Sequence, residues 1–273
     1  MLVCTLGDLL LDVIVRASGP LAPGADTPVA TRLATGGQAA NVASWVVALG
    51  EEARFVGKLA DDPAGELARS LLERRGVEVA GPLAEGASGV VVAFVGPDGE
   101  RSMATDRGVA PELRADELES AWLACDRLHI SGYGLLADPI GEAALAAARL
   151  AREAGAAVSV DLSSWSTIRE FGPERFRARL EELAPDLVFA NEPEWELVGG
   201  AYGLAETAVV KRGARGVAVL SESDSGEYPP LGAEVVDTTG AGDALAAGFL
   251  VGGIELGLEA AARCVAQVGA VPV

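Results

Sequence analysis

A glycine-rich segment near the carboxyl end of the chain contains residue types that could hold an anion and move a proton. Residues 237–243 read Asp-Thr-Thr-Gly-Ala-Gly-Asp, follow a short expected strand at residues 234–236 and open an apolar stretch of helical period. Glycines let the backbone approach a ligand closely, and N–H groups in the first turn of a helix carry partial positive charge. We therefore expect Gly240, Ala241 and Gly242 to form an anion hole for a transferring phosphoryl group, with Asp243 accepting the proton of an attacking hydroxyl.

Two other interpretations of this segment are open. A dinucleotide-binding fingerprint would need a third glycine and a place after the first strand, whereas Leu245 stands at the third position and the segment lies near the carboxyl end. Alternatively, the segment is only a glycine-rich turn, and Asp243 is a negative charge that favours the start of a helix.

A second segment with chemical potential lies near the amino end. Residues 36–43 read Gly-Gly-Gln-Ala-Ala-Asn-Val-Ala, so that two glycines run into a helix with a polar Asn in an apolar first turn. Gly36 and Gly37 permit a hinge and close substrate approach, and Asn41 can both donate to and accept from sugar hydroxyls. A Gly-Gly turn before a helix is also a common structural feature, so this segment is informative only in combination with the first.

The charge of the chain limits its partners. Its 273 residues carry a formal net charge of −19, and the sequence pI is about 4.4. Such a field repels nucleic acid and anionic membranes, so we expect neither as a partner. An anionic ligand must then be held by local groups, namely backbone N–H groups at helix starts, a few placed cations and a divalent metal ion.

Hydropathy and the rarer residues predict a cytoplasmic protein. Half of the residues are hydrophobic, yet charged residues interrupt every apolar stretch, and we expect no transmembrane helix and no secretion signal. Cys4, Cys125 and Cys264 are odd in number and far apart, which predicts reduced, buried thiols. The only histidine, His129, lies in an expected strand, where a buried structural role is expected.

Short apolar runs alternate with longer stretches of helical period, which is the pattern of βαβ units around a mostly parallel sheet. Strands are expected near residues 3–6, 54–57, 128–131, 157–161, 187–190, 208–210 and 217–220. Helices are expected near residues 39–49, 63–75, 111–124, 139–154, 173–183, 192–198, 240–250 and 256–268.

One region departs from this alternation. Residues 88–95 and 100–105 are typical of two strands joined by the turn Gly-Pro-Asp-Gly at 96–99. Together with residues 13–16 and 29–33 they could form a small β-sheet, with its strands within 12–34 and 88–106 of a single domain spanning 1–273. Such a lid would cover a site at the carboxyl edge of the main sheet.

In combination, the two glycine-containing segments resemble the two characteristic regions of the ribokinase-like, or PfkB-type, carbohydrate kinases, in order and in separation. The resemblance extends over essentially the whole chain through residues 7–12, 191–194 and 211–216. It implies an α/β fold with a doubly wound, mostly parallel sheet flanked by helices and a small β-sheet lid. It also implies a phosphotransferase that uses ATP with Mg²⁺ and an alcohol group as acceptor.

Residue by residue, the resemblance implies particular roles. Asp243 is similar to the family's catalytic base, and Gly240, Ala241 and Gly242 to its anion hole. Asn191 and Glu194 match an Asn-x-x-Glu element that helps to organise Mg²⁺ and phosphate, with Glu194 acting on the metal indirectly. The remaining matches are Lys211, Gly213 and Gly216 for the nucleotide, Asp8, Asp12, Gly36, Gly37, Asn41 and Arg107 for the substrate, and Asp237 and Thr239 for a monovalent cation such as K⁺.

Departures from the family pattern bear on the acceptor. Leu10 stands where ribokinases proper carry Asn, which is closer to the fructokinase and 2-keto-3-deoxygluconate kinase branch, and residues 161–164 read Asp-Leu-Ser-Ser where Asp-Pro-Asn is frequent. We therefore expect a small sugar or sugar acid other than ribose. A nucleoside or phosphosugar kinase of the same family and a non-catalytic nucleotide- or sugar-binding regulator are the alternatives, and lids that pair between subunits would make a homodimer.

Overall fold

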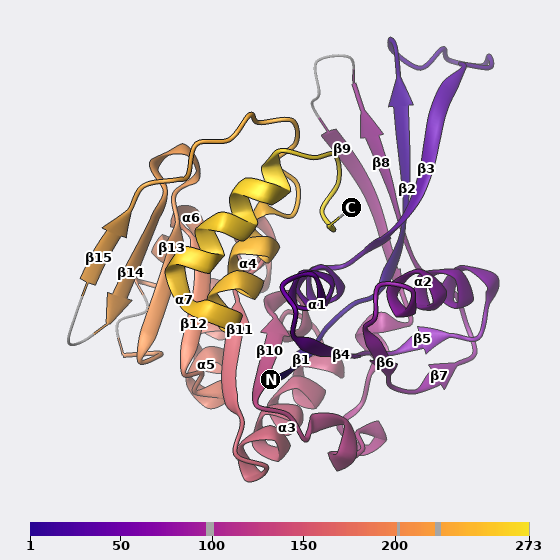
Figure 1. Cartoon of the computed structure of the whole chain (residues 1–273). Helices are drawn as coiled ribbons and strands as arrows, with labels where there is room; N and C mark the ends of the chain where they lie inside the picture. Colours follow the sequence, from indigo (N-terminus) through magenta and orange to yellow (C-terminus); the bar gives the residue numbers. More distant parts are fainter. Residues whose placement is uncertain (97–100, 201–202, 222–224, 273) are drawn as a thin grey trace.

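The computed structural model describes residues 1–96, 101–200, 203–221 and 225–272, and its main element is a nine-stranded sheet (Figure 1). Seven neighbouring strands are parallel, and the two strands at the other edge are added by antiparallel pairing. This confirms the expected doubly wound, mostly parallel fold. In spatial order the strands are β15 (Ser225–Tyr228), β14 (Val217–Ser221), β13 (Thr207–Lys211), β12 (Leu187–Asn191), β11 (Ala157–Asp161), β10 (Arg127–Ser131), β1 (Leu2–Leu6), β4 (Glu52–Val56) and β6 (Glu78–Ala80).

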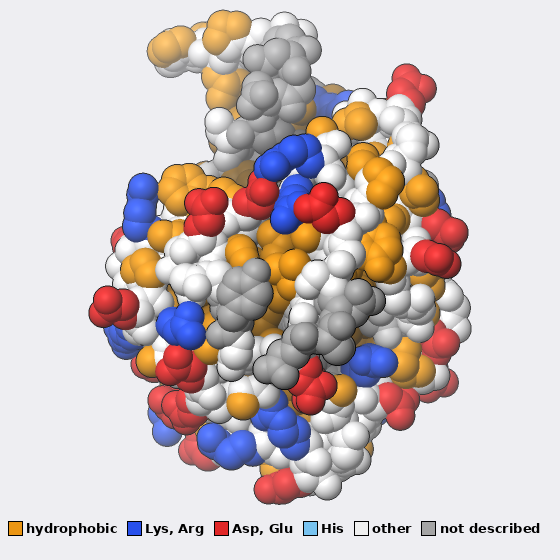
Figure 2. All heavy atoms as spheres, turned by 90° about the vertical axis from the view of Figure 1, so that its left-hand side faces the viewer, with side chains coloured by type: hydrophobic (Ala, Val, Ile, Leu, Met, Phe, Trp, Pro, Cys, Tyr) orange, Lys and Arg blue, Asp and Glu red, His pale blue; other side chains and the backbone are white. Residues whose placement is uncertain are grey.

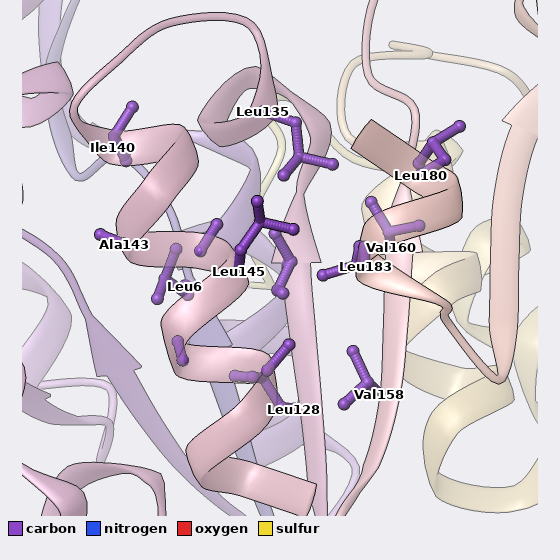
Figure 3. Packing of buried hydrophobic residues seen from close by; sticks show 14 of the residues in the cluster. Leu6, Leu128, Leu135, Ile140, Ala143, Leu145, Val158, Val160, Leu180 and Leu183 are labelled. Carbon is purple, nitrogen blue, oxygen red and sulfur yellow. The ribbon is translucent and has the colours of Figure 1, made fainter. Parts of the chain in front are cut away.

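Helices cover both faces of this sheet because its central strands are apolar on both sides. In β12, Phe189 packs into one core and its neighbour Val188 into the other, and both are fully buried. One core contains α1 (Gln38–Ala48), α2 (Pro63–Glu73) and α7 (Ala241–Val265). The opposite core contains α3 (Ile140–Glu153), α4 (Trp165–Phe171), α5 (Pro173–Leu183) and α6 (Glu192–Leu197), and Figure 3 shows α3 and α5 packed there on the central strands.

A smaller sheet begins just beyond the carboxyl end of β1 and stands away from the body of the molecule (Figure 1). Its order is β3 (Val29–Gly36), β2 (Leu10–Ala17), β8 (Ser88–Val95) and β9 (Arg101–Gly108). The outer pairs are antiparallel and β2 pairs with β8 in parallel. We call this sheet the lid. The expected Gly-Pro-Asp-Gly turn falls largely on residues 97–100, outside the described residues. A two-stranded sheet of β5 (Leu59–Ala60) and β7 (Leu83–Ala84) lies in the same part of the chain.

Two expected elements differ in the structure. Residues 111–124 form three short 3₁₀ turns rather than one helix, because Glu117 accepts a hydrogen bond from the backbone N–H of Arg114 and so starts a new turn. Residues 234–236 are not a strand, and the N–H of Val236 instead donates to the carbonyl of Val265 at the end of α7. The two helices expected after residue 240 are confirmed, because the backbone of α7 is not helical at Gly252 and Gly253, which divide it into two helical parts. The expectations did not include α4, β5, β6, β7 and β15.

Helix α7 is long and apolar enough to cross a membrane by length and composition alone. Its backbone leaves the helical conformation at Gly252 and Gly253, and it packs against α1. Leu245, Leu250 and Cys264 are buried in the core between α7 and the sheet. The apolar composition of α7 therefore corresponds to the core that it covers.

Candidate active site

The carboxyl ends of the parallel strands bring distant residues of the chain to one edge of the sheet. Asp8 follows β1, Tyr133 follows β10, Asp161 ends β11, Asn191 ends β12 and Lys211 ends β13. Ligands of open α/β sheets bind outside this edge. The starts of α1 and α7 and the base of the lid complete the candidate site.

Asp243 lies in the first turn of α7, where its Oδ2 accepts a hydrogen bond of 2.8 Å from Nδ2 of Asn41 on α1. Burial, together with the negative charge of Asp161, raises the pKa of Asp243 to about 7, although the Asn41 hydrogen bond and Lys211 oppose the shift. The side chain is only half-buried, so it is accessible to a ligand. A carboxylate that titrates near neutral pH and can be reached from solvent is suited to general-base catalysis.

The backbone before Asp243 adopts the tight turn that its glycines predict. Gly240 caps α7 in the left-handed region with φ 77°, and a Cβ on it would lie 2.5 Å from the Cα of Ala270. The N–H of Ala241 closes the turn on the carbonyl of Thr238 at 3.3 Å. Among the described residues, the N–H groups of Gly242 and Asp243 meet no acceptor, so these two are the donors that remain for an anion at the start of α7.

A buried ion pair lies beside these donors. Nζ of Lys211 donates to Oδ2 of Asp161 at 2.5 Å, and a Cβ placed on Gly242 would lie 3.2 Å from the same Nζ. Burial disfavours the ammonium, but the carboxylates of Asp161 and Glu194 outweigh it and raise the pKa of Lys211. Lys211 therefore stays protonated next to the expected anion hole. Asp161 is 1% exposed and was not among the residues expected at the site.

Asn191 and Glu194 form a capping box at the start of α6. The backbone N–H and Nδ2 of Asn191 donate to the two oxygens of Glu194, and the N–H of Glu194 donates to Oδ1 of Asn191. Burial, reinforced by the charge of Asp161, raises the pKa of Glu194. The capping box thus fixes the carboxylate of Glu194 at the start of α6.

A cavity of about 680 Å³ opens between the start of α7 and the loops around β13 and β14. Figure 2 faces the β14–β15 side of the molecule, where apolar side chains lie among scattered charged ones. Lys211, Thr238 and Gly242 form a polar end of the cavity, and its remaining walls are mostly apolar. The predicted nucleotide residues Gly213 and Gly216 both line it. The apolar lining includes Val217, Leu231, Val235, Leu245, Leu258 and Val265. A mostly apolar cavity with a polar end suits a ligand that joins an apolar ring to a polar chain.

At the base of the lid, several polar groups lie close to the start of α1, which carries Asn41. The guanidinium of Arg107 binds the carboxylate of Asp8 through two hydrogen bonds of 2.6 and 2.9 Å and also donates to the carbonyl of Tyr133. A Cβ on Gly37 would lie 2.1 Å from the carbonyl oxygen of Asp8, and one on Gly36 would lie 1.9 Å from Oδ1 of Asp12. The glycine pair thus lets α1 start directly against both aspartates.

Gln38, Ser131 and Ser163 form a polar cluster that the sequence motifs did not predict. Oε1 of Gln38 accepts hydrogen bonds of 2.6 Å from the hydroxyls of both serines, while Ser163 also donates to the carbonyl of Asp161. Ser163 has φ 76°, an uncommon conformation for a residue other than glycine. The departure from Asp-Pro-Asn at residues 161–164 was the only sequence signal for this cluster.

Asp237 and Thr239 form hydrogen bonds that hold the loop before α7. Oδ1 of Asp237 accepts from the N–H of Thr239 at 3.0 Å, and Oδ2 accepts from the N–H of Gly269 at 2.7 Å, which ties the loop to the segment after α7. Among the residues that the structure describes, no group of three or more His, Cys, Asp or Glu could hold a metal ion. His129 is buried, as predicted, with Nδ1 2.9 Å from the Ser159 hydroxyl. The three cysteines are free thiols, of which Cys4 and Cys264 are buried as predicted and Cys125 is only half-buried.

Comparison with known proteins agrees with this geometry. The model of the pfkB family of carbohydrate kinases matches residues 1–273. An ATP-dependent ribose-1-phosphate kinase from Halopiger xanaduensis is 33% identical over an alignment 280 residues long. The alignment covers 96% of this chain and 90% of that protein. Fructokinase-1 from Zea mays is 32% identical over 271 residues, covering 91% and 82%. A probable sugar kinase from Rhizobium etli CFN 42 superposes with a TM-score of 0.87 over 99% of this chain and 94% of its own, at 27% identity.

The chain belongs to the pfkB family of carbohydrate kinases. Its similarity to these relatives, together with its ribokinase-like fold, supports a kinase of a sugar or a nucleoside.

Proposed function

We propose that this protein transfers the γ-phosphate of ATP to a hydroxyl of a small sugar or sugar acid, with Asp243 as the general base. The observation that carries the proposal is the position of Asp243 between two different environments. On one side lie the N–H groups of α7, Lys211 and the largely apolar cavity. On the other lie the polar groups at the base of the lid and Asn41. A substrate hydroxyl bound there would meet the base and the phosphoryl group together.

Each group then has a defined task. Asp243 removes the proton from the acceptor hydroxyl as the oxygen attacks in line. The N–H groups of Gly242 and Asp243 and the ammonium of Lys211 stabilise the negative charge on the transferring phosphoryl oxygens. Asn41 holds Asp243 in place, and its buried Oδ1, which finds no donor in the described part of the chain, can accept from a substrate hydroxyl.

Mg²⁺ fits this site as an ion carried by the nucleotide. It keeps several waters and binds through substrate phosphates with few protein carboxylates, which agrees with the absence of a ligand cluster among the described residues. When bound, it would neutralise charge on the phosphates. Asp161 and Glu194 supply negative charge near Lys211 to favour it. A K⁺ ion at the Asp237 loop is a separate proposal, supported by the carboxylate there.

The fructokinase relative supports a free sugar as acceptor. The ribose-1-phosphate kinase relative, which covers slightly more of the chain, favours a phosphosugar as the second candidate. In this proposal the two candidate reactions use the same base and the same phosphoryl donor and differ only in the acceptor.

An assay of ATP-dependent phosphorylation tests the proposal. The panel comprises fructose, 2-keto-3-deoxygluconate, ribose 1-phosphate and adenosine, with product detected by mass spectrometry. At least one acceptor should be phosphorylated by the wild type and by an Arg114→Ala variant, whose exposed ion pair serves as a control, but not by Asp243→Asn. If ATP binds and no acceptor across a wider panel of sugars and nucleosides is phosphorylated, the protein is a regulator.

The lid supports a further proposal, a homodimer formed through its outer face. Strand pairing puts Val13, Leu33 and Val92 on the face opposite to Asp12, and Leu33 is 49% exposed. Light scattering should give twice the chain mass of 27.8 kDa. Leu33→Lys should return a monomer, whereas Met103→Lys, on the face that carries Asp12, should not. A monomeric wild type would contradict the proposal.

A further inference from the structure

We infer that Asp161 is a positioning residue for phosphoryl transfer, which holds the ammonium of Lys211 at the start of α7 and supports Asp243 as the base through its charge. The inference rests on the proposed function, because it needs Lys211 to meet the transferring phosphoryl group and Asp243 to take the proton. Asp161 is 1% exposed, so it acts through these two side chains.

Asp161 is fixed in place at the carboxyl end of β11. Its Oδ1 accepts a hydrogen bond of 3.2 Å from the N–H of Ser163, and its Oδ2 accepts one of 2.5 Å from Nζ of Lys211. A buried carboxylate that is held by a backbone donor and an ammonium has little freedom to rotate. Lys211 is therefore bonded to a rigid acceptor.

The bond to Asp161 determines where the ammonium of Lys211 lies. A lysine side chain has four rotatable bonds and loses about 2 kcal/mol of conformational entropy when it is held in one rotamer. Bonded to Asp161, Nζ of Lys211 lies where a Cβ on Gly242 would come within 3.2 Å of it. The N–H of Gly242 is a donor for the phosphoryl group in the proposed mechanism. Asp161 thus brings a cation and a backbone donor to the same place before the nucleotide binds.

An alternative role for Asp161 is only to neutralise Lys211. In that case its removal would strengthen the attraction between Lys211 and the phosphates of ATP and would leave kcat unchanged. The structure favours positioning, because 18% of the Lys211 side chain stays exposed towards a ligand while the carboxylate behind it is buried. A positioning role requires Asp161 for kcat and not for the affinity of ATP.

The titratable groups around Asp243 show how the charge of Asp161 reaches the base. In the described part of the chain, those that interact with Asp243 are Tyr133, Asp161, Lys211 and Cys264. Burial raises the pKa of Tyr133, and it raises the pKa of Cys264 to about 12, so both stay neutral at pH 7. The ion pair of Asp161 and Lys211 is therefore the charged neighbour of the base.

The two members of this ion pair act on Asp243 in opposite directions. Burial raises the pKa of Asp243 to about 7 and Asp161 contributes in the same direction, whereas the hydrogen bond from Asn41 and the charge of Lys211 lower it. Removal of Asp161 deletes a negative charge and leaves Lys211 unopposed, so both effects lower the pKa of Asp243. Removal of Lys211 has the opposite effect.

Kinetics of Asp161→Asn test the positioning of Lys211. The acceptor is the compound of the phosphorylation panel that the wild type converts fastest. In the variant, kcat should fall roughly tenfold or more, because Lys211 loses its fixed place beside the phosphoryl group. The Kd for ATP with Mg²⁺, measured by calorimetry, should stay within about threefold of the wild-type value or decrease, because the ammonium is no longer neutralised.

The pH profile of kcat/KM tests the effect on the base. In Asp161→Asn the acid limb should move to lower pH by roughly one unit, and in Lys211→Met it should move to higher pH. A purely structural role of Asp161 would not move the limb. Movement in the same direction in both variants, or in neither, overturns the inference.

Asp186→Asn is the matched control. Oδ2 of Asp186 accepts a hydrogen bond of 2.6 Å from the N–H of Val158, near the amino end of the same strand β11. The change therefore removes one carboxylate that is bonded to β11 but lies at the opposite edge of the sheet. Both kcat and the acid limb should match the wild type.

Glu194 is the other carboxylate beside Lys211, so its titration must be separated from that of Asp243. Burial, reinforced by the charge of Asp161, raises the pKa of Glu194. Glu194→Gln removes this titration and should leave the acid limb near pH 7 in place. An acid limb that disappears in Glu194→Gln would belong to Glu194 and would overturn the inference.

The remaining outcomes are also distinct. Equal losses of kcat and ATP affinity in Asp161→Asn with an unmoved acid limb, or tighter ATP binding with unchanged kcat, overturn the inference and leave the kinase function intact. A wild type that phosphorylates no acceptor overturns the proposed function instead. If a single variant does not fold, Lys211→Met/Asp161→Asn removes both buried charges together. Its acid limb should lie near that of the wild type with kcat still low, and a wild-type kcat would overturn the inference.

Discussion

The carboxylate of Asp243 at the start of α7 accepts a hydrogen bond from Asn41 of α1, although the two residues are 202 positions apart in the chain. One comes from each of the two glycine-containing segments. The bond thus joins the proposed base to the proposed acceptor pocket. It also favours the ionised carboxylate and so opposes the effect of burial.

The base should be essential for turnover and dispensable for nucleotide binding. In Asp243→Asn the shape is kept but the proton acceptor is lost, so kcat should fall by roughly 10²–10⁴. ATP affinity, measured by calorimetry, should stay within about threefold, because the cavity walls and Lys211 are unchanged. Wild-type kcat in this variant would remove Asp243 from the mechanism.

The pH dependence of kcat/KM should report the same group. With a pKa of about 7, Asp243 is increasingly protonated below neutral pH, so activity should fall on the acid side of pH 7 and level off above it. Replacing Asn41 by Leu removes a hydrogen bond to the charged form, and the acid limb should move to higher pH. An acid limb near pH 4 in the wild type would contradict this assignment.

The raised pKa of Asp243 also makes the stability of the folded protein depend on pH. The folded-state pKa of Asp243 lies above the ordinary value of 3.8, so ionisation of this carboxylate disfavours the folded state as pH rises through the range from about 4 to 7. Asp243→Asn should therefore raise Tm at pH 8 more than at pH 5. The half-buried position of the side chain limits the size of the effect. A difference in Tm that shrinks with rising pH would contradict the raised pKa.

The Lys211–Asp161 pair should be strongly coupled. Lys211→Met leaves Asp161, which is 1% exposed, as a buried carboxylate without its cation, and should lower the free energy of unfolding by about 3 kcal/mol. The double variant Lys211→Met/Asp161→Asn should recover part of that loss. Urea unfolding of the wild type, Lys211→Met, Asp161→Asn and the double variant gives the coupling energy. Additive losses of unfolding free energy would show that the two side chains are not coupled.

Gly37 should tolerate no side chain. It has φ 96°, and a Cβ would lie 2.1 Å from the carbonyl oxygen of Asp8. Gly155 has a similar φ of 90° with open space around it, so Gly155→Ala is a control for backbone strain alone, at about 1 kcal/mol. Gly37→Ala should lower the unfolding free energy by more than this and reduce kcat/KM, as urea unfolding and the phosphorylation assay would measure. Equal effects of the two changes would mean that the close approach to Asp8 can relax.

The large sheet and most of its helices were predictable because strand and helix signals are local. Apolar runs such as residues 157–161 and the proline at residue 173 specify their elements without distant partners. Residues 111–124 were predicted wrongly because Glu117 bonds both to the backbone of Arg114 and to Lys58, and Lys58 is far away in the sequence. Short edge strands such as β6 and β15 depend on their neighbours for the same reason.

The sequence by itself determined the family and the turn before α7, and it predicted Asp243 as the base, since Asp243 and its glycines are recognised by residue type and spacing. Only the tertiary structure decided what surrounds them. Asp161 beside Lys211, Gln38 between two serines, and Asp8 on Arg107 all join residues from different strand ends. The physical reason is that hydrogen bonds and ion pairs act over a few ångströms, and parallel strands bring their carboxyl ends together regardless of separation in the chain.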